Sequence, residues 1–424
     1  MLKAGFSRVD VTPPLGSSLE GYFTPRHAKG VLDPLYLNAL ALSVGENKAL
    51  IVTADFEMMR MTYMDIVRKK ISERVGIPEN NIMISTLHPH TSIAVRATRG
   101  NNILDDRAYI DMLYRKFCDA SEMAINDMAD AELSFGIEET SEKIAFIRRY
   151  LMKDGSYVTN PFKRRNEVVR PYRDADNNVR LCRFKREGKK DIALVNFSTH
   201  PDVIGGEYIS ADWPGFARRF VEKDIEDTHC LLINGVEGDS NHYDFTSELK
   251  SGYDHSRHMG RVIADTVIRL WDKTEEIKVE GLSSDVEIIL NKTRTDGIDD
   301  YEWALKVYND PDKSSYTGAE LAKSSRVVNL ISAPIFQKIP VTVINLGRIG
   351  IVGFGGEPFT QYGDDLRERA SDRIIICACC TNGGEGYLPT TEAFLEGGYE
   401  ASASPFSPNL EEQCLESAVK LLNK

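Results

Sequence analysis

Two histidines lie close together in the stretch "ISTLHPHTS", residues 84–92, although the chain has only eight histidines among 424 residues. His88 and His90 flank a proline directly after an apolar, β-branched run that is typical of a buried strand. If the backbone stays extended, both imidazoles lie on one face of the chain. Imidazole binds metals and also acts as a general acid or base. The pair is therefore interpreted as two metal ligands, as one ligand beside a group that acts on a substrate, or as a hydrogen-bonded structural pair.

Three further polar residues follow runs of the same kind: His200 in "STHP", Glu357 in "GGEP" and Tyr387 in "GEGY". Zinc takes nitrogen and oxygen ligands around a tetrahedron, and a hydrolytic site keeps one position for water. Read singly, His200 is a structural histidine, Glu357 belongs to a helix start and Tyr387 is a packing residue. Their shared position after strand-like runs favours a zinc site.

These side chains need elements that bring them together. Apolar, β-branched runs predict strands at 49–56, 81–90, 192–201, 230–239, 341–358 and 373–387. Helical periodicity predicts helices at 62–75, 107–131, 214–224, 256–272, 362–371 and 409–422. This alternation predicts an α/β fold in layers, with a mostly parallel or mixed sheet and flanking helices. In such sheets ligands bind at the C-terminal ends of the strands, where we expect the metal site.

The segments between the predicted strands and helices have sequence signals of their own. "YLMKDGSYV" (150–158) predicts a hairpin with Asp-Gly at its turn. Residues 161–180 read as a long loop of the kind that covers a site. The charged stretch at about 275–340 is predicted to be an insertion or subdomain within one catalytic domain that spans 1–424.

Composition excludes several classes of function. The net charge is −12 and no basic stripe stands out, so we expect no nucleic-acid partner. The sequence shows neither the apolar core of a signal peptide at its start nor a transmembrane segment. We expect a small-molecule substrate, and homo-oligomerisation stays open.

The seven cysteines are interpreted as reduced, mostly buried thiols of a cytoplasmic protein. Three of them lie in "IICACCTNG", which raises the alternative of a soft-metal site. Strand alternation sends Cys377 and Cys379 to one face and Cys380 to the other, and this argues against such a site.

Several other polar residues have two readings. Asp55, Asp212 and Asp239 either orient a ligand histidine or cap helices and satisfy loop backbone. His255 and His258, three residues apart in "YDHSRHMG", are expected to be solvated or capping residues rather than ligands.

The ordered blocks "LHPHTS", "NFSTHP", "GVEGDSN", "GGEPFT" and "GYLPTTEAF", with the opening "GFSRVDVTPP", resemble the catalytic domain of the neutral/alkaline non-lysosomal ceramidase family. The resemblance covers nearly the whole chain. It implies that Zn²⁺ is bound by four ligands, which match His88, His200, Glu357 and Tyr387.

The resemblance also assigns residues to the reaction. His90 matches the histidine that contacts the reacting group, and Tyr399 matches a further tyrosine at the site. Arg148 is the best match for an arginine that faces the substrate, with Arg149 as the alternative.

The chain departs from the family in three places. The family's "GDVSPN" block reads "GDSNH" here, so Ser240 is one place early and Asn241 stands where the catalytic serine is expected. The glycine-rich "SGP" after the two histidines is "TSI". The family's C-terminal β-sandwich domain is not expected in this chain.

The combined prediction is a zinc-dependent hydrolase that cleaves an amide bond, with water activated by the metal. One alternative is a zinc hydrolase of a small polar substrate, such as a glycoside, an ester or an N-acyl sugar or amino acid. The other is a non-catalytic protein in which the metal only stabilises the fold.

Overall fold

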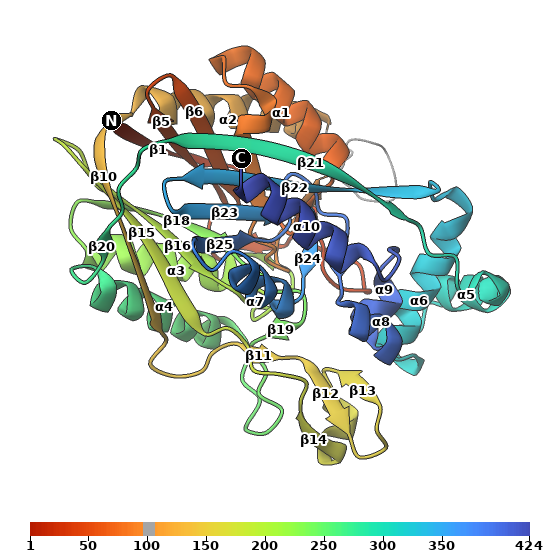
Figure 1. Cartoon of the computed structure of the whole chain (residues 1–424). Coiled ribbons are helices and arrows are strands. Elements are labelled where there is room, and N and C mark those ends of the chain that lie inside the picture. The colour runs from red at the N-terminus through yellow and green to blue at the C-terminus, as the bar shows by residue number, and fades with distance from the viewer. Residues whose placement is uncertain (96–106) are drawn as a thin grey trace.

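A computed structural model of the chain describes residues 1–95 and 107–424 (Figure 1). Its larger sheet has the strand order β18-β16-β15-β10-β1-β5-β6-β8, with β20 paired to β10. The bounds are β1 Leu2–Asp10, β5 Tyr36–Val44, β6 Asn47–Ala54, β8 Ile82–Thr86, β10 Ala129–Glu139, β15 Asn178–Arg186, β16 Asp191–Phe197, β18 Thr228–Asn234 and β20 Glu275–Glu276. The pairs β6–β8 and β16–β18 are parallel and the other pairs of this sheet are antiparallel, so the predicted mixed sheet is confirmed.

A second sheet has the order β21-β22-β23-β25. Its strands are β21 Leu282–Lys292, β22 Phe336–Leu346, β23 Ile349–Phe354 and β25 Ile374–Ala378, and the last pair is parallel. The single strand predicted at 341–358 is therefore wrong, because the segment is a hairpin. It turns at Gly347, whose φ of 58° lies in the left-handed region that glycine adopts without strain.

The two sheets and their helices form four layers. The helices are α1 Met61–Val75, α2 Arg107–Asn126, α3 Asp212–Asp224, α4 Tyr253–Leu270, α5 Tyr301–Asn309, α6 Gly318–Asn329, α7 Thr360–Arg369, α8 Thr391–Glu396, α9 Tyr399–Ala403 and α10 Leu410–Leu422. One face of the larger sheet is covered by α1 and α2 at its β8 end and by α3 and α4 at its β18 end. The other face packs on the second sheet, whose outer face carries α7 and α10 (Figure 1).

Alternation along the strands decides which layer each side chain joins. In β6, Leu50 and Val52 pack with α1 and α2, whereas Ala49 and Ile51 face the second sheet. Because successive side chains point to opposite faces, a strand buried on both sides reads as a continuous apolar run. This is why the sequence pattern locates the strands well.

Short strand pairs hold the loops at the C-terminal ends. They are β2 Ser18–Leu19 with β3 Arg26–His27, β4 Gly30–Val31 with β17 Tyr208–Ile209, β7 Met58–Met59 with β9 Ala94–Val95, β11 Phe146–Ile147 with β19 Ser240–Asn241, and β24 Glu357–Pro358 with β26 Tyr387–Leu388. The predicted hairpin is confirmed as β12 Arg149–Met152 and β13 Tyr157–Thr159, and β14 Val168–Pro171 joins it from the predicted loop.

The charged middle of the chain is partly core. β21 and β22 pair along their length within the second sheet, and α5 and α6 are carried between them at one end of the molecule (Figure 1). A capping box starts α6: the Thr317 hydroxyl accepts from the Glu320 N–H, and the Glu320 carboxylate accepts from the Thr317 N–H. The division into one domain with an insertion stays a prediction.

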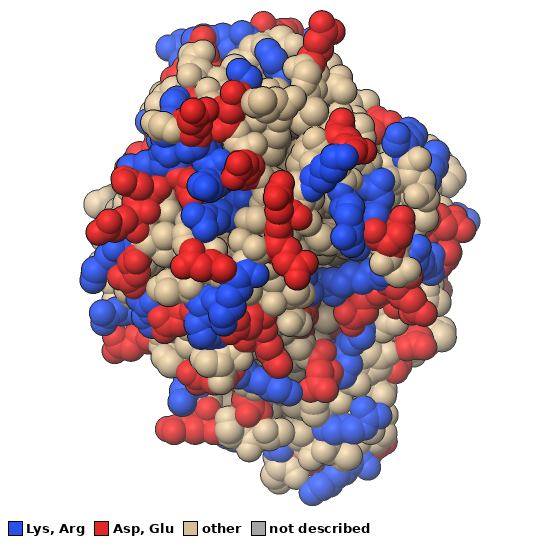
Figure 2. Space-filling model, turned by 60° about the vertical axis from the view of Figure 1, so that its left-hand side comes forward, with Lys and Arg blue, Asp and Glu red and all other residues tan. Residues whose placement is uncertain are grey.

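The distribution of surface charge and the lengths of the helices bear on which partners the protein could have, nucleic acid or membrane. On the face shown in Figure 2, basic and acidic side chains lie interspersed. Many charged side chains of the described residues form ion pairs, such as Arg164 with Asp154 and Glu167. Among the described residues, no helix has the length and apolar character that crossing a bilayer requires.

A buried ion pair joins two layers. Arg218 on α3 donates to both carboxylate oxygens of Asp55, at 2.7 and 2.6 Å, just after β6. Both side chains are almost completely buried. Asp55 also accepts the Tyr36 N–H, so it has a structural role and does not orient a ligand histidine.

We expect Asp55→Ala to lower the free energy of unfolding by about 3–5 kcal/mol, because the Arg218 charge would stay buried and unpaired. Glu122→Ala is the control. It breaks the exposed pair of Glu122 with Arg74 and is expected to cost less than about 1 kcal/mol. Urea unfolding measures both. Equal effects would contradict the structural role of the buried pair.

Candidate metal and catalytic site

His88 and His200 each follow the C-terminal end of a strand. His88 lies two residues beyond β8, and His200 lies three residues beyond β16. His88 has a φ of 69°, which is uncommon for a residue with a side chain. The extended backbone assumed for residues 88–90 is therefore wrong. The turn still brings the rings together, with centroids of His88 and His90 5.2 Å apart.

Main-chain carbonyls hold both rings in one orientation. The Nδ1 of His88 lies 2.7 Å from the Glu57 carbonyl oxygen. The Nδ1 of His200 lies 2.8 Å from the Glu237 carbonyl oxygen and 3.1 Å from that of Ser240. A carbonyl oxygen only accepts, so we assign the ring proton to Nδ1 in both cases. Each Nε2 is then a free lone pair, as a metal ligand needs.

Glu357 faces both of these nitrogens. Its Oε2 lies 3.6 Å from the His88 Nε2 and 3.3 Å from the His200 Nε2. Zinc–ligand bonds of about 2.1 Å around a tetrahedron place ligand atoms about 3.4 Å apart. Oε2 of Glu357 and Nε2 of His200 are buried and have no hydrogen-bond partner among the described residues. The three atoms therefore fit a metal ion better than they fit one another.

The pKa shifts of these residues also indicate a site for a cation. Burial alone would raise the pKa of Glu357, but His88 and His200 outweigh it and hold the pKa at about 2. Burial and the Arg148 charge would lower the pKa of His200, but the carboxylates of Glu237 and Glu357 raise it to about 9. The carboxylates thus draw positive charge into a buried site. A divalent cation held by these residues would supply that charge and displace the protons.

Tyr387 reaches the site through a strand pair. β24 and β26 are parallel, and Glu357 lies opposite Tyr387 in their register. The Tyr387 ring stacks on the ring of His200 with centroids 6.3 Å apart. Its hydroxyl is the predicted fourth ligand, and this assignment stays a prediction.

His90 completes the group of imidazoles. Its ring centroid lies 5.6 Å from that of His200, and its Nδ1 has no hydrogen-bond partner among the described residues. Burial and the neighbouring charge of His88 lower the pKa of His90 well below its usual value. A Cβ on Gly21 would come within 2.5 Å of this ring, so the segment around Gly21 closes directly over it.

Arg148 and Tyr399 lie on the Tyr387 side. The Arg148 guanidinium carbon lies 5.3 Å from the Tyr387 ring centroid and 5.9 Å from that of Tyr399. Its Nε donates to Glu400 and its Nη2 to the Gly238 carbonyl. Arg149, the alternative, instead donates to Glu396 and to the Gly397 carbonyl.

A cavity of about 540 Å³ opens at these residues. His88, His90, Glu357, Tyr387 and Tyr399 line its inner part. Its outer part is lined by the aromatic loop residues Tyr22 and Phe23 and by α6 with the segment after it. Arg148 is not among the lining residues that the structure describes, and its guanidinium lies behind the two tyrosine rings.

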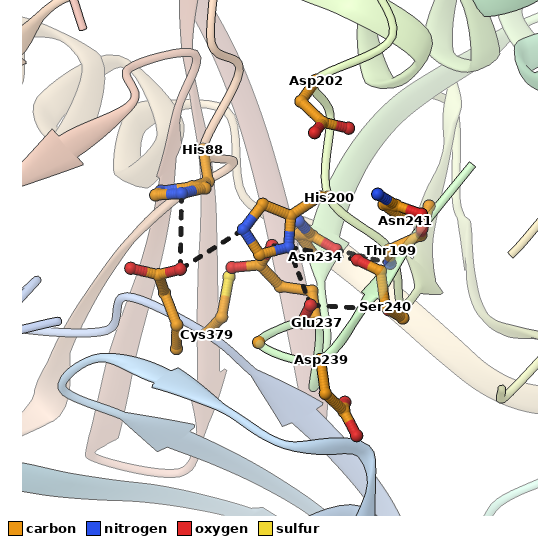
Figure 3. A network of polar contacts seen from close by, with 12 residues as sticks. His88, Thr199, His200, Asp202, Asn234, Glu237, Asp239, Ser240, Asn241 and Cys379 are labelled. Carbon is orange, nitrogen blue, oxygen red and sulfur yellow. Dashed lines mark hydrogen bonds and ion pairs between the residues drawn. The ribbon is translucent and has the colours of Figure 1, made fainter. Parts of the chain in front are cut away.

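Ser240 supports the site through its backbone. Its carbonyl accepts from His200, whereas its hydroxyl donates to the Glu237 carbonyl over 3.5 Å (Figure 3). Asn241, at the position of the family serine, donates to the Asn160 side chain. The catalytic role of Ser240 stays a prediction.

The two remaining aspartates hold loops. Asp239 accepts the N–H and hydroxyl of Thr360 and so caps α7. Asp212 accepts the N–H groups of Val203 and Ile204 and fixes the chain after His200. His258 pairs with Glu142 at the surface, away from the site, and His255 stacks on His258.

Glu237 is the important residue that the sequence analysis did not single out. It is fully buried after β18, and its Oε2 lies 2.8 Å from the His200 Nδ1 (Figure 3). The available signal was an acidic residue between glycines in "GVEGD", directly after a buried strand. Glu57 was also missed, because it acts through its main-chain carbonyl, which any residue type supplies.

Comparisons with known proteins identify the family of the chain. Residues 2–319 match the family described as neutral/alkaline non-lysosomal ceramidase, N-terminal. A curated relative, the neutral ceramidase of Mycobacterium tuberculosis (strain ATCC 25618 / H37Rv), is 28% identical over 88 residues, which are 19% of this chain and 14% of the relative.

Solved structures extend the likeness to the whole fold. Neutral ceramidase from Pseudomonas aeruginosa matches with a TM-score of 0.77 and 14% identity, over 99% of this chain and 74% of that chain. A structure described as ceramidase complexed with C2 gives the same values. At this identity the likeness shows the fold alone. The match to the family over residues 2–319 shows that the chain belongs to the neutral/alkaline non-lysosomal ceramidase family.

Proposed function

We propose that this chain is a zinc-dependent hydrolase that cleaves the amide bond of an N-acyl substrate, with ceramide as the first candidate. One observation carries the proposal: a buried Glu357 oxygen faces two imidazole Nε2 atoms at the spacing of zinc ligands, without a hydrogen-bond partner among the described residues. The ceramidase names of its relatives supply the bond. His88, His200 and Glu357 would hold the ion, with Tyr387 as the fourth ligand.

The zinc ion and the protein groups around it have different roles in the reaction. Bound zinc acts as a Lewis acid that polarises a carbonyl and lowers the pKa of water toward neutrality. His90 lines the cavity with its Nδ1 lacking a hydrogen-bond partner among the described residues. It is placed to take a proton from the attacking water and to give one to the leaving amine.

Tyr399 is the donor to the developing oxyanion. It lines the cavity, and burial raises its pKa to about 12, so its hydroxyl stays protonated at neutral pH. A well-placed donor of this kind is worth about 3–4 kcal/mol in the transition state. Arg148, held by Glu400 and Gly238, positions both tyrosine rings from behind.

A second candidate is a small polar N-acyl compound. The outer cavity carries Arg326, Asn329 and Gln337 beside Leu330 and Phe23. Each of these three side chains donates a hydrogen bond within the protein, and the polar groups that they keep beyond those bonds suit a polar substrate better than a long alkyl chain. This observation favours a polar substrate, whereas the family favours ceramide. An ester or a glycoside is the weaker variant of this candidate.

The state of the cysteines bears on the compartment in which the protein works. All seven cysteines lie in the described residues and none is paired there. We propose that the protein works in a reducing compartment, the cytoplasm, on a small-molecule substrate. A homo-oligomeric state stays a prediction.

We expect zinc-loaded protein to release fatty acid from a short-chain ceramide, and a chelator to reduce the release to background, because the ligands alone activate no water. Mass spectrometry of the product measures both. A panel of N-acetylated sugars and amino acids is tested beside it. If product is released from the polar compounds and not from ceramide, the second candidate, a small polar N-acyl compound, becomes the substrate class. Chelator-resistant release would contradict the zinc mechanism.

We expect His88→Ala and His200→Ala each to bind one zinc ion fewer per chain than the unmodified protein, because each loses an Nε2 ligand. His258→Ala is the control. That histidine is 46% exposed and pairs with Glu142, so the zinc content is expected to stay unchanged. Elemental analysis after dialysis gives the ratios. Full zinc content in the His88 and His200 variants would overturn the ligand set.

We expect Tyr399→Phe to lower kcat about 10²–10³-fold, because it removes one oxyanion donor. Ser240→Ala also removes one hydroxyl, but that hydroxyl makes only a long contact with the Glu237 carbonyl. We expect a change below about tenfold for it. Steady-state kinetics on folded, zinc-loaded protein compare the two. The reverse order would restore Ser240 as the catalytic residue.

A further inference from the structure

Two adjacent cysteines lie behind the histidines. Cys379 and Cys380 follow the end of β25 at Ala378, and both are fully buried. The Cys379 N–H donates to the Asn234 carbonyl, and the Cys380 N–H donates to the Gly356 carbonyl. Cys380 has a φ of 42°, so strand alternation does not extend to it. The prediction that the two thiols face opposite sides is therefore wrong.

The thiols instead converge on Glu237. The two Sγ atoms and one Glu237 carboxylate oxygen all lie within 4.8 Å of one another. Figure 3 shows the Cys379 side chain beside Glu237, below the ring of His200. The Sγ of Cys380 lies 4.0 Å from the Nδ1 of His88. The three groups thus occupy the Nδ1 side of the histidines, and Glu357 occupies the Nε2 side.

The Glu237 carboxylate needs a positive partner. It is fully buried, and its carboxylate is contacted by the His200 Nδ1 at 2.8 Å and by the Cys379 thiol. The single proton on the His200 Nδ1 is also directed at two main-chain carbonyls, so Glu237 shares it with them. An ionised carboxylate buried with so little compensation destabilises the fold unless a cation neutralises it.

The donor types define the cation. Two thiolates select thiophilic ions such as Zn²⁺, Cd²⁺ and Cu⁺, whereas Mg²⁺ and Ca²⁺ prefer oxygen. A carboxylate as third donor suits a divalent ion that accepts mixed sulfur and oxygen ligands in a tetrahedron. Zn²⁺ meets both conditions, and Cd²⁺ is its spectroscopic probe.

We propose that Glu237, Cys379 and Cys380 form a second metal site, specific for a thiophilic divalent ion and separate from the site of His88, His200 and Glu357. Glu237 lies between the two sites: one carboxylate oxygen lies within 4.8 Å of ligand atoms of His88, His200 and Glu357, and one lies within 4.8 Å of both Sγ atoms. The proposal does not depend on the reaction that the first site catalyses.

Cadmium titration of the reduced, metal-free protein tests this site. We expect about two ions per chain, with a thiolate-to-cadmium charge-transfer absorption that saturates with one of them. The double variant Cys379→Ala/Cys380→Ala is expected to lose that band and one ion. Cys414→Ala removes an equally buried free thiol on α10 and is expected to keep both. Absence of the band in the unmodified protein, or its persistence in the double variant, would overturn the proposal.

Two further measurements distinguish the second metal site from a folding defect of the double variant and from the first metal site. X-ray absorption of the cadmium-loaded unmodified protein reports sulfur ligands directly, so the result stands even where the double variant fails to fold. No sulfur around cadmium would overturn the site. Glu357→Ala is expected to lose one ion but keep the band, because that residue serves the first site alone. Loss of the band in Glu357→Ala would merge the two sites into one and contradict the proposal.

Discussion

The buried carboxylate of Glu357 sets the constraint on which the rest of the site depends. An ionised carboxylate deep in a protein must be paired, and Glu357 faces two imidazole nitrogens at distances that suit a shared cation. His88 and His200 follow strands β8 and β16 of the larger sheet, whereas Glu357 follows strand β23 of the second sheet. The position of Glu357 relative to the two histidines therefore depends on how the two sheets pack. The apolar layer between the sheets fixes it, and this layer resists small displacements because it is close-packed.

Orientation is the second requirement, and the backbone meets it. The carbonyls of Glu57, Glu237 and Ser240 fix the ring tautomers of His88 and His200. His88 reaches its position in a left-handed conformation, which costs about 1–3 kcal/mol. Such strain persists only where the surrounding core over-determines the position. Two features provide that support here: the hydrogen bond from the His88 N–H to the Phe56 carbonyl, and the complete burial of β8.

The sequence was informative where burial imposes a pattern. Strands buried on both faces are apolar runs, so their ends, and with them His88, His200 and Glu357, could be located from residue types alone. The hydrophobic pattern of the sequence could not predict features that depend on the backbone path after a strand ends. The turn at Gly347 split one predicted strand into two, and the left-handed Cys380 reversed an alternation argument. The choice of Arg148 over Arg149 depends on which side chain lies over Tyr387, which alternation leaves undecided.

Charge balance connects the two clusters. Glu357 and Glu237 face the same imidazole, His200, from Nε2 and from Nδ1. A protonated His200 serves both carboxylates, which explains why its pKa rises to about 9 without a metal. A cation held on the Nε2 side would neutralise Glu357 and remove the need for that proton. Glu237 would then face only the N–H of a neutral ring, already directed at two carbonyls. Filling the first site thus leaves the second carboxylate short of positive charge, beside two thiols that bind the ions able to supply it.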